Sequence, residues 1–267
     1  MNPYIKLPKV PVVNGRQEVI LGKCANKSVL HLGCVDSGLV LDRFNRGELM
    51  HQKLSNVASE LWGIDIDAEG ISYLSSKGFD NLIADDICDL DRIEVLQKQS
   101  FDVIVASEII EHLENPGLFL NSVKGLMVPE KTELIVTVPN AFRIDTLIWL
   151  FRGIEYVHPD HNYWFSYHTA TNLLQKSYFE ISDIYVYTFQ PLRILPSRMG
   201  RIIEGQEGVT KNRDTGKDRP ASKSFFELFY SYLRSLPRRL VVSLLYKRTP
   251  FWGDGIIIIA KSTGNDC

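Results

Sequence analysis

The sequence predicts an α/β fold in which a mainly parallel sheet is flanked by helices. Short strand-like apolar runs alternate with helix-like stretches from residue 28 to residue 190, which is the pattern of repeated βαβ units. A further run, residues 254–261, is short and dense in isoleucine, so we expect a buried strand there. The chain has 267 residues, 45% of them hydrophobic, which is enough to bury a full core.

Each predicted strand corresponds to one apolar run. In chain order the runs are residues 28–33, 60–65, 81–84, 101–106, 133–138, 179–189 and 254–261. Helices are expected in the gaps, including residues 68–76 and 116–126. Asn115 is a suitable N-cap for the second of these helices, because Pro116 then occupies the first helical position.

Charge divides the chain into an acidic core and a basic segment. Residues 1–190 contain 16 Lys and Arg against 25 Asp and Glu, whereas residues 191–250 contain 13 against 5. We therefore expect an N-terminal extension, a core, a basic cap or insertion, and a last core strand with its tail, at 1–27, 28–190, 191–250 and 251–267. Within the basic segment, residues 205–222 predict a loop and residues 224–246 an amphipathic helix interrupted at Pro237.

Composition favours a cytoplasmic protein. No apolar run reaches the roughly 18 residues that a bilayer span needs, and the N-terminus lacks the layout of a signal peptide. The four cysteines have no CxxC spacing, so we expect free thiols rather than disulfides or a zinc site.

The first predicted strand ends in a glycine turn, VLHLGCVDSG, at residues 29–38. A dinucleotide fingerprint would need a glycine where Val35 stands. A P-loop would need a lysine after Gly38, where Leu39 stands. Both phosphate-binding interpretations are therefore rejected.

The same turn resembles motif I of the class I S-adenosylmethionine-dependent methyltransferases, usually VLDLGCGxG. It departs from that form at His31, Val35 and Ser37. The resemblance implies a Rossmann-like fold with a mainly parallel seven-stranded sheet whose last strand is antiparallel. It also implies that Gly33 and Cys34 contact S-adenosylmethionine.

Acidic residues follow the next two predicted strands. Asp65 ends the second strand, where a carboxylate can accept hydrogen bonds from two ribose hydroxyls, and it aligns with the ribose-binding acid of the family. Asp67 is expected to cap the following helix. After the third strand, ADDICDL resembles the family's GDxxxL element, which implies that Asp86 and Ile87 contact the adenine. Asp85 is the alternative by one register.

The fourth strand continues into ASEIIEHLENP, which resembles a segment of the ubiquinone-biosynthesis O-methyltransferases and related proteins. In a helical turn, Glu108, Glu111 and His112 would share a face. His112 would then be a general base oriented by Glu111, or all three would hold a divalent metal such as Mg²⁺. Ser107 and Ile66, each beside a strand end, are expected to contact the cofactor.

Two loop histidines offer another base. The stretch HPDHNYWFSYH resembles a segment of the same group, and His158 or His161 could act in place of His112.

The leading functional prediction is O-methylation of a hydroxyl on a small molecule or glycan. The basic segment 191–250 would hold an anionic substrate or lie on the inner face of a membrane. A metal-dependent RNA terminal ribose methyltransferase and a non-catalytic S-adenosylmethionine-binding protein are the alternatives, although the acidic core does not favour nucleic acid. The sequence leaves the acceptor, the metal requirement and the oligomeric state undetermined.

Overall fold

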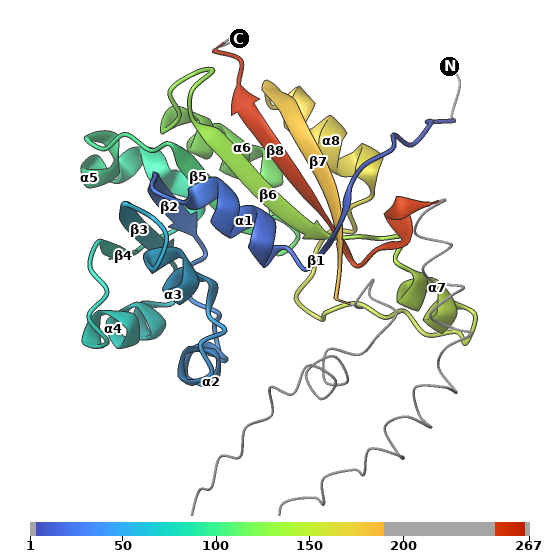
Figure 1. Ribbon diagram of the computed structural model, residues 1–267, viewed down its shortest axis with the longest axis horizontal. Coiled ribbons are helices and arrows are strands. Elements are labelled where there is room, and N and C mark those ends of the chain that lie inside the picture. Colours follow the sequence, from blue (N-terminus) through green and yellow to red (C-terminus); the bar gives the residue numbers. More distant parts are fainter. Residues whose placement is uncertain (1–3, 190–248, 265–267) are drawn as a thin grey trace, which may run out of the picture. The chain divides into compact units, whose positions relative to one another are not determined.

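The computed structural model describes residues 4–189 and 249–264 (Figure 1). The chain divides into two compact units, residues 1–188 with 250–267, and residues 189–249. The sheet and its helices belong to the first unit. The loop expected at 205–222 and the helix expected at 224–246 lie outside the described residues.

The described strands form one eight-stranded sheet. They are β1 (Val12–Asn14), β2 (Ser28–Leu32), β3 (Glu60–Asp65), β4 (Leu82–Ala84), β5 (Val103–Ser107), β6 (Glu133–Pro139), β7 (Phe179–Thr188) and β8 (Gly255–Ser262). The helices are α1 (Gln17–Cys24), α2 (Val40–Asn45), α3 (Met50–Ser55), α4 (Ala68–Ser76), η1 (Ile87–Arg92), α5 (Glu94–Gln97), α6 (Pro116–Gly125), α7 (Ile144–Leu150), α8 (Tyr167–Lys176) and η2 (Pro250–Trp252).

Strand order confirms the predicted fold class. The order is β1-β7-β8-β6-β5-β2-β3-β4, and all neighbouring pairs are parallel except the two that involve β8. The last strand is therefore antiparallel, as expected. The strand number differs, because β1, which lies within the segment expected to be an extension, pairs with β7 and forms the edge of the sheet. Three residues are too few to show a strand pattern in the sequence.

The isoleucines of β8 show how both faces of the sheet are covered. Ile256 and Ile258 pack in one apolar cluster with residues of α6 and α8, whereas Ile257 and Ile259 pack in a second cluster with residues of α1 and α3. All four are fully buried. Since alternate residues of a strand point to opposite faces, both faces of the sheet are covered. Each buried isoleucine contributes roughly 1.5–3 kcal/mol.

Helix starts follow the caps predicted from the sequence. The Asp67 side chain accepts from the Gly70 N–H at the start of α4, and that of Asn115 accepts from the Leu118 N–H at the start of α6. Each cap satisfies a backbone donor that the helix leaves free.

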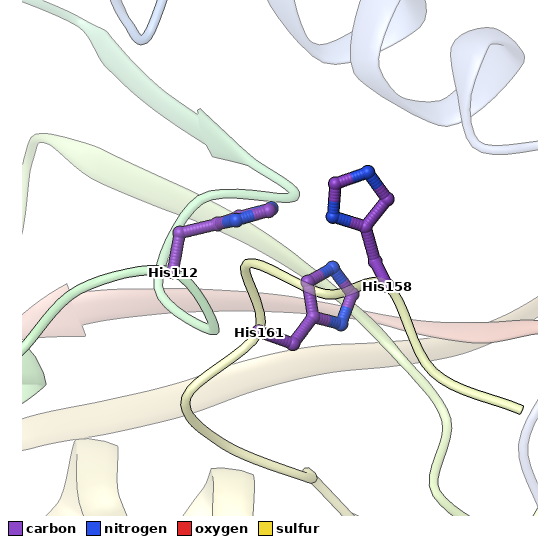
Figure 2. Close-up of side chains that lie close together, drawn as sticks. All are labelled: His112, His158 and His161. Carbon is purple, nitrogen blue, oxygen red and sulfur yellow. The ribbon is translucent and has the colours of Figure 1, made fainter. Parts of the chain in front are cut away.

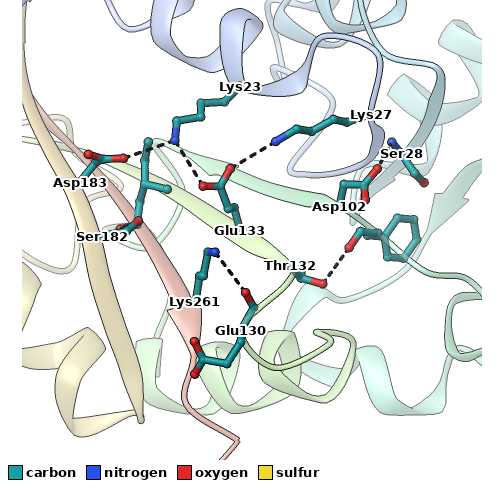
Figure 3. A network of polar contacts seen from close by, with 12 residues as sticks. Lys23, Lys27, Ser28, Asp102, Glu130, Thr132, Glu133, Ser182, Asp183 and Lys261 are labelled. Carbon is teal, nitrogen blue, oxygen red and sulfur yellow. Dashed lines mark hydrogen bonds and ion pairs between the residues drawn. The ribbon is translucent and has the colours of Figure 1, made fainter.

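An ionic network ties α1 to β6 and β7 (Figure 3). Lys23 of α1 contacts Glu133, the first residue of β6, at 3.2 Å and Asp183 of β7 at 3.3 Å, and Lys27 contacts Glu133 at 3.4 Å. Burial opposes ionisation of Glu133, but the two lysines together lower its pKa. The N-terminal segment is therefore bound to the core.

Within the described residues, none of the helices has the length and apolarity required to cross a bilayer.

Candidate active site

The carboxyl ends of the parallel strands β2, β3, β4, β5 and β6 meet along one edge of the sheet. In open α/β sheets this edge is where ligands bind. The residues predicted from the sequence follow these strands directly, so the fold brings most of them to a common edge.

The turn after β2 requires glycine at position 33. Gly33 has a φ of 67°, and a Cβ atom there would collide with Cδ1 of Ile109, which lies in the turn after β5. The N–H groups of Gly33 and Cys34 both donate to the Ile64 carbonyl at the end of β3. The turn thus joins three strand ends and leaves its backbone close to the ligand edge.

The departures from motif I are accommodated within the fold. Val35 is 5% exposed and packs against Gly70 of α4, where any Cβ would collide with the valine side chain. Its N–H donates to Asp65 Oδ2 at 2.8 Å, and the Ser37 hydroxyl donates to Asp67 Oδ2 at 3.0 Å. The valine points into the protein rather than toward the ligand edge.

Asp65 is held where a ribose-binding acid is expected. It is 6% exposed, and its two oxygens accept from the N–H groups of Val35 and Asp67. Burial raises its pKa, while these hydrogen bonds oppose the shift. The next residue, Ile66, is 76% exposed, an unusual position for so apolar a side chain. An exposed isoleucine beside a buried acid suits a ligand in which a flat ring is joined to a group with hydroxyls.

The expected adenine contacts lie after β4. Asp86 is exposed and caps η1, accepting from the Cys88 N–H at 2.8 Å. Asp85 is also exposed and accepts from the Asp86 N–H. Ile87 is 8% exposed and packs in the main core, so little of its surface remains for a ligand. The adenine contacts stay a prediction.

A small polar pocket lies beside the glycine turn. Gly33, Cys34 and Ser107 line it, as do two arginines that sequence reasoning missed, Arg16 and Arg43. Arg16 Nε donates to the Ser107 hydroxyl at 3.0 Å across 91 residues of sequence. No local pattern indicates such a contact, which depends on α1 folding against the strand end.

A buried histidine pair lies under the turn. His31 of β2 and His51 of α3 stack with ring centroids 5.5 Å apart, and their Nδ1 atoms are 3.3 Å apart. Burial lowers the pKa of each to about 3, so both are neutral at pH 7. His31, which replaces the usual acid of motif I, is therefore a core residue. Its partner His51 comes from α3, which lies outside the glycine turn in sequence.

The turn after β5 differs from the sequence prediction. Glu108 has a φ of 55°, and no helix forms between the end of β5 and Pro116. Glu108, Glu111 and His112 therefore do not share a helical face. The reason is that Glu108 is held elsewhere. Its N–H donates to the carbonyl and hydroxyl of Thr137, and its Oε1 accepts from the hydroxyls of Thr137 and Tyr187.

Glu111 is buried without full hydrogen bonding. It is 1% exposed, and its Oε2 has no partner. Burial, with a further contribution from Glu108, raises its pKa to about 9, so it is protonated at pH 7. A protonated acid whose Oε2 has no hydrogen-bond partner does not fit the expected role of orienting His112. It is also a poor metal ligand, and the expected metal set of Glu108, Glu111 and His112 is not assembled.

His112 instead joins the two loop histidines (Figure 2). One potential ligand nitrogen each of His112, His158 and His161 lies within 4.8 Å of the others. The ring centroids of His112 and His161 are 4.5 Å apart, and those of His158 and His161 are 5.3 Å apart. Burial lowers the pKa of His112, and burial with the neighbouring imidazoles lowers that of His161 to about 4. Both rings are neutral near pH 7 and can accept a proton.

Comparison with known proteins identifies the family. Residues 18–183 match the family model described as a methyltransferase domain. The chain is 25% identical over 126 residues to a ubiquinone biosynthesis O-methyltransferase of Rhodopseudomonas palustris (strain TIE-1), covering 47% of this chain and 49% of that protein. It is 24% identical over 131 residues to the protein of the same name from Bradyrhizobium diazoefficiens, covering 49% and 51%. The chain spans about half the length of these curated relatives.

Solved structures support the fold. The YcgJ protein from Bacillus subtilis aligns with a TM-score of 0.50 at 12% identity, over 93% of this chain and 98% of that one. The cyclase SpnF aligns with a TM-score of 0.50 at 13% identity, over 92% and 80%. Because a cyclase shares the fold, the architecture alone does not determine the reaction. The family match covers more than half of the sequence, and the chain therefore belongs to the methyltransferase domain family, with the fold of the class I S-adenosylmethionine-dependent methyltransferases.

Proposed function

We propose that the protein transfers the methyl group of S-adenosylmethionine to a hydroxyl oxygen of a small molecule or glycan. Two features carry this proposal. A buried acid ends β3, and a histidine cluster combines the turn after β5 with the loop between α7 and α8. The first suits the cofactor and the second suits proton removal from an acceptor.

The cofactor would lie across the ends of β2, β3 and β4. Asp65 would accept from the ribose hydroxyls, exposed Ile66 would pack on the adenine, and Asp86 would accept from the adenine amino group. Burial raises the pKa of Asp65 and so strengthens the case for a ligand that donates to it.

The methionine end would enter the small pocket beside Gly33 and Cys34. Arg16 suits a carboxylate and also contacts Ser107, whereas Arg43 is paired with Asp36 of the same pocket at 2.6 Å. Burial lowers the pKa of Arg16, but nearby Glu108 and Tyr187 raise it above the ordinary value, so it is a permanent cation.

The histidine cluster would activate the acceptor. His112 is the expected base, with His161 as the alternative. The hydroxyl oxygen bonds to the methyl carbon, the carbon–sulfur bond breaks with its electron pair remaining on sulfur, and the hydroxyl proton passes to the imidazole. Both rings are neutral near pH 7, as a base must be.

The named relatives indicate which class of acceptor to test first. Both are ubiquinone biosynthesis O-methyltransferases, so an aromatic hydroxyl is the first acceptor to test, and a sugar hydroxyl is the second. Incubation with S-adenosylmethionine carrying a labelled methyl group and panels of catechols, quinols and glycans should label the oxygen of one class. Label recovered only on nitrogen or carbon would contradict the proposal, as would failure to bind the cofactor.

The basic segment 191–250 is proposed to hold an anionic acceptor or an anionic membrane surface. Its excess of Lys and Arg is the support, since its structure lies outside the described residues apart from its last two positions. Flotation with vesicles that contain anionic lipid should recover the full chain. Replacing its arginines 234, 238 and 239 by glutamine should reduce recovery, and equal recovery would remove the membrane version.

A further inference from the structure

The three clustered histidines come from two loops that are joined to each other. His112 lies in the turn after β5, while His158 and His161 lie in the loop between α7 and α8. Figure 2 shows the three rings gathered in the space between these loops. Sequence reasoning treated these residues as alternatives, but the fold places them together.

Backbone and side-chain bonds fix the two loops at this point. The N–H of Asn162 donates to the Glu111 carbonyl and its side-chain amide donates to the His112 carbonyl, both at 2.8 Å. The Tyr163 hydroxyl donates to the Glu114 carbonyl at 2.9 Å. The histidines are therefore held near one another by bonds that do not involve their own rings.

Asp160 contacts the ring of His158. Its N–H donates to Nδ1 of His158 at 3.3 Å, and its carboxylate Oδ2 lies 3.7 Å from the same atom. Histidines that bind metals almost always donate their other N–H to a carboxylate or a backbone carbonyl. The Asp160 carboxylate is the group near this ring that can take that role when His158 changes rotamer.

The donor set selects the kind of ion. Three imidazoles without a carboxylate suit zinc, copper, nickel or iron, whereas magnesium and calcium require oxygen ligands. In a tetrahedral zinc site, ligand nitrogens are about 3.3 Å apart, given Zn–N distances of about 2.0–2.1 Å. The ligand nitrogens of the three histidines lie up to 4.8 Å apart, so movements of roughly 1.5 Å would bring them to the tetrahedral spacing. His158 is exposed and can make such a movement by a change of rotamer.

We propose that His112, His158 and His161 form a binding site for one Zn²⁺ ion with an open coordination position facing the acceptor. This inference rests on the proposed function for what the ion does. Three protein ligands leave a position for the acceptor oxygen, and a bound cation lowers the pKa of a hydroxyl. With the ion bound, the lowered pKa of the acceptor hydroxyl replaces proton transfer to a free imidazole, and the hydroxyl proton leaves to solvent.

The test is a zinc titration of the tag-free, chelator-treated full chain by calorimetry. We expect one Zn²⁺ per chain, and an affinity about 100-fold or more weaker in the His158→Ala and His161→Ala variants. His168→Ala is the matched control, because His168 is an exposed histidine on α8 outside the cluster, and it should bind as the native chain does. Mg²⁺ should give no saturable signal.

Co²⁺ substitution identifies the ligands independently of affinity. A tetrahedral site of nitrogen ligands gives visible d–d absorption without a thiolate charge-transfer band. Such a band would assign the ion to a cysteine such as Cys88, which is partly exposed, and would overturn the site. The absence of stoichiometric zinc binding, or equal affinity in His161→Ala, would also overturn it.

The same preparations separate this inference from the proposed function. If the chelator-treated protein binds the cofactor but takes up no zinc in the titration, the zinc site is refuted and the methyltransferase proposal stands. Stoichiometric zinc binding without cofactor binding would support the zinc site and refute the methyltransferase proposal.

Discussion

The cofactor end and the acceptor end of the candidate site are built in different ways. At the cofactor end, Asp65 is 6% exposed with both oxygens hydrogen-bonded to backbone N–H groups, and Gly33 fixes the turn beside it. At the acceptor end, Glu111 leaves a buried oxygen unpartnered, and the histidines on the two loops are partly or fully exposed. The acid of the first end is fixed by backbone N–H groups, whereas the second end presents loop side chains, one of which has an unpartnered oxygen.

This difference bears on how the sequence of each end can vary among members of a family. A cofactor that all members of a family share can be bound by backbone groups, whose geometry tolerates changes such as Val35. An acceptor that differs between members is better bound by loop side chains, because loops vary without cost to the core. Unpartnered polar groups cost stability, and they collect where a ligand completes the bonding.

The largest expected effect separates the two ends kinetically. His112→Ala should lower kcat about 100- to 10,000-fold, because it removes the group that activates the acceptor. The affinity for S-adenosylmethionine should be unchanged. Steady-state kinetics with the best acceptor from the panel, together with cofactor titration, measures both.

His168→Ala is the control for that experiment and should keep its rate. If His112→Ala weakened cofactor binding as much as it slowed the reaction, the two ends would not be independent.

The two ends also differ in how buried titratable groups make the stability of the fold depend on pH. His31 and His51 have pKa values of about 3 in the fold against an ordinary 6.5, so the unfolded chain binds protons that the folded chain does not as pH falls below 6.5. Their stabilising contribution is therefore present above pH 6.5 and is lost toward pH 3, by about 1.4 kcal/mol per pH unit for each ring. Glu111 has the opposite sign, since its raised pKa favours the folded state at low pH.

Urea unfolding at pH 7 and pH 5 measures this dependence. The double variant His31→Leu/His51→Leu removes both partners of the buried pair, so it should remain folded at pH 7 and lose less stability at pH 5 than the native chain. Equal losses in both proteins would show that the pair does not titrate as the buried geometry requires.

A smaller effect tests the rigidity of the cofactor end. Gly33→Ala places a side chain at a φ of 67° and against Ile109, so it should cost about 1–2 kcal/mol for the backbone and about 1–3 kcal/mol for the collision. Gly47→Ala is matched in φ, at 66°, but its Cβ meets no atom within 4 Å. Thermal unfolding should therefore show a larger loss for Gly33→Ala, and equal losses would contradict the close contact with Ile109.

The sequence was sufficient for most of the fold because seven of the eight described strands are local apolar runs. The antiparallel last strand, the caps at Asp67 and Asn115, and the position of Asp65 at the end of β3 all agree with prediction. The three-residue strand β1 was missed because it has too little pattern.

The acceptor end was less predictable, since its contacts join distant segments. The expected helical turn assumed that Glu108 is free, but Thr137 and Tyr187 hold it in a left-handed conformation. The pairing of His31 with His51, and of Arg16 with Ser107, likewise depends on tertiary packing that no local spacing encodes. His112 and His161 were recognised separately, and only the fold places them together.

Calorimetric titration with S-adenosylmethionine tests the central claim, that Asp65 marks a cofactor site separate from the acceptor end. The native chain and His161→Ala should bind with equal affinity. Asp65→Ala should bind about 100-fold more weakly or worse, because two hydrogen bonds to a charged group are worth about 1.5–3 kcal/mol each. Glu69→Ala, a nearby exposed acid on α4, should bind normally. Unchanged affinity in a folded Asp65→Ala protein would contradict the account.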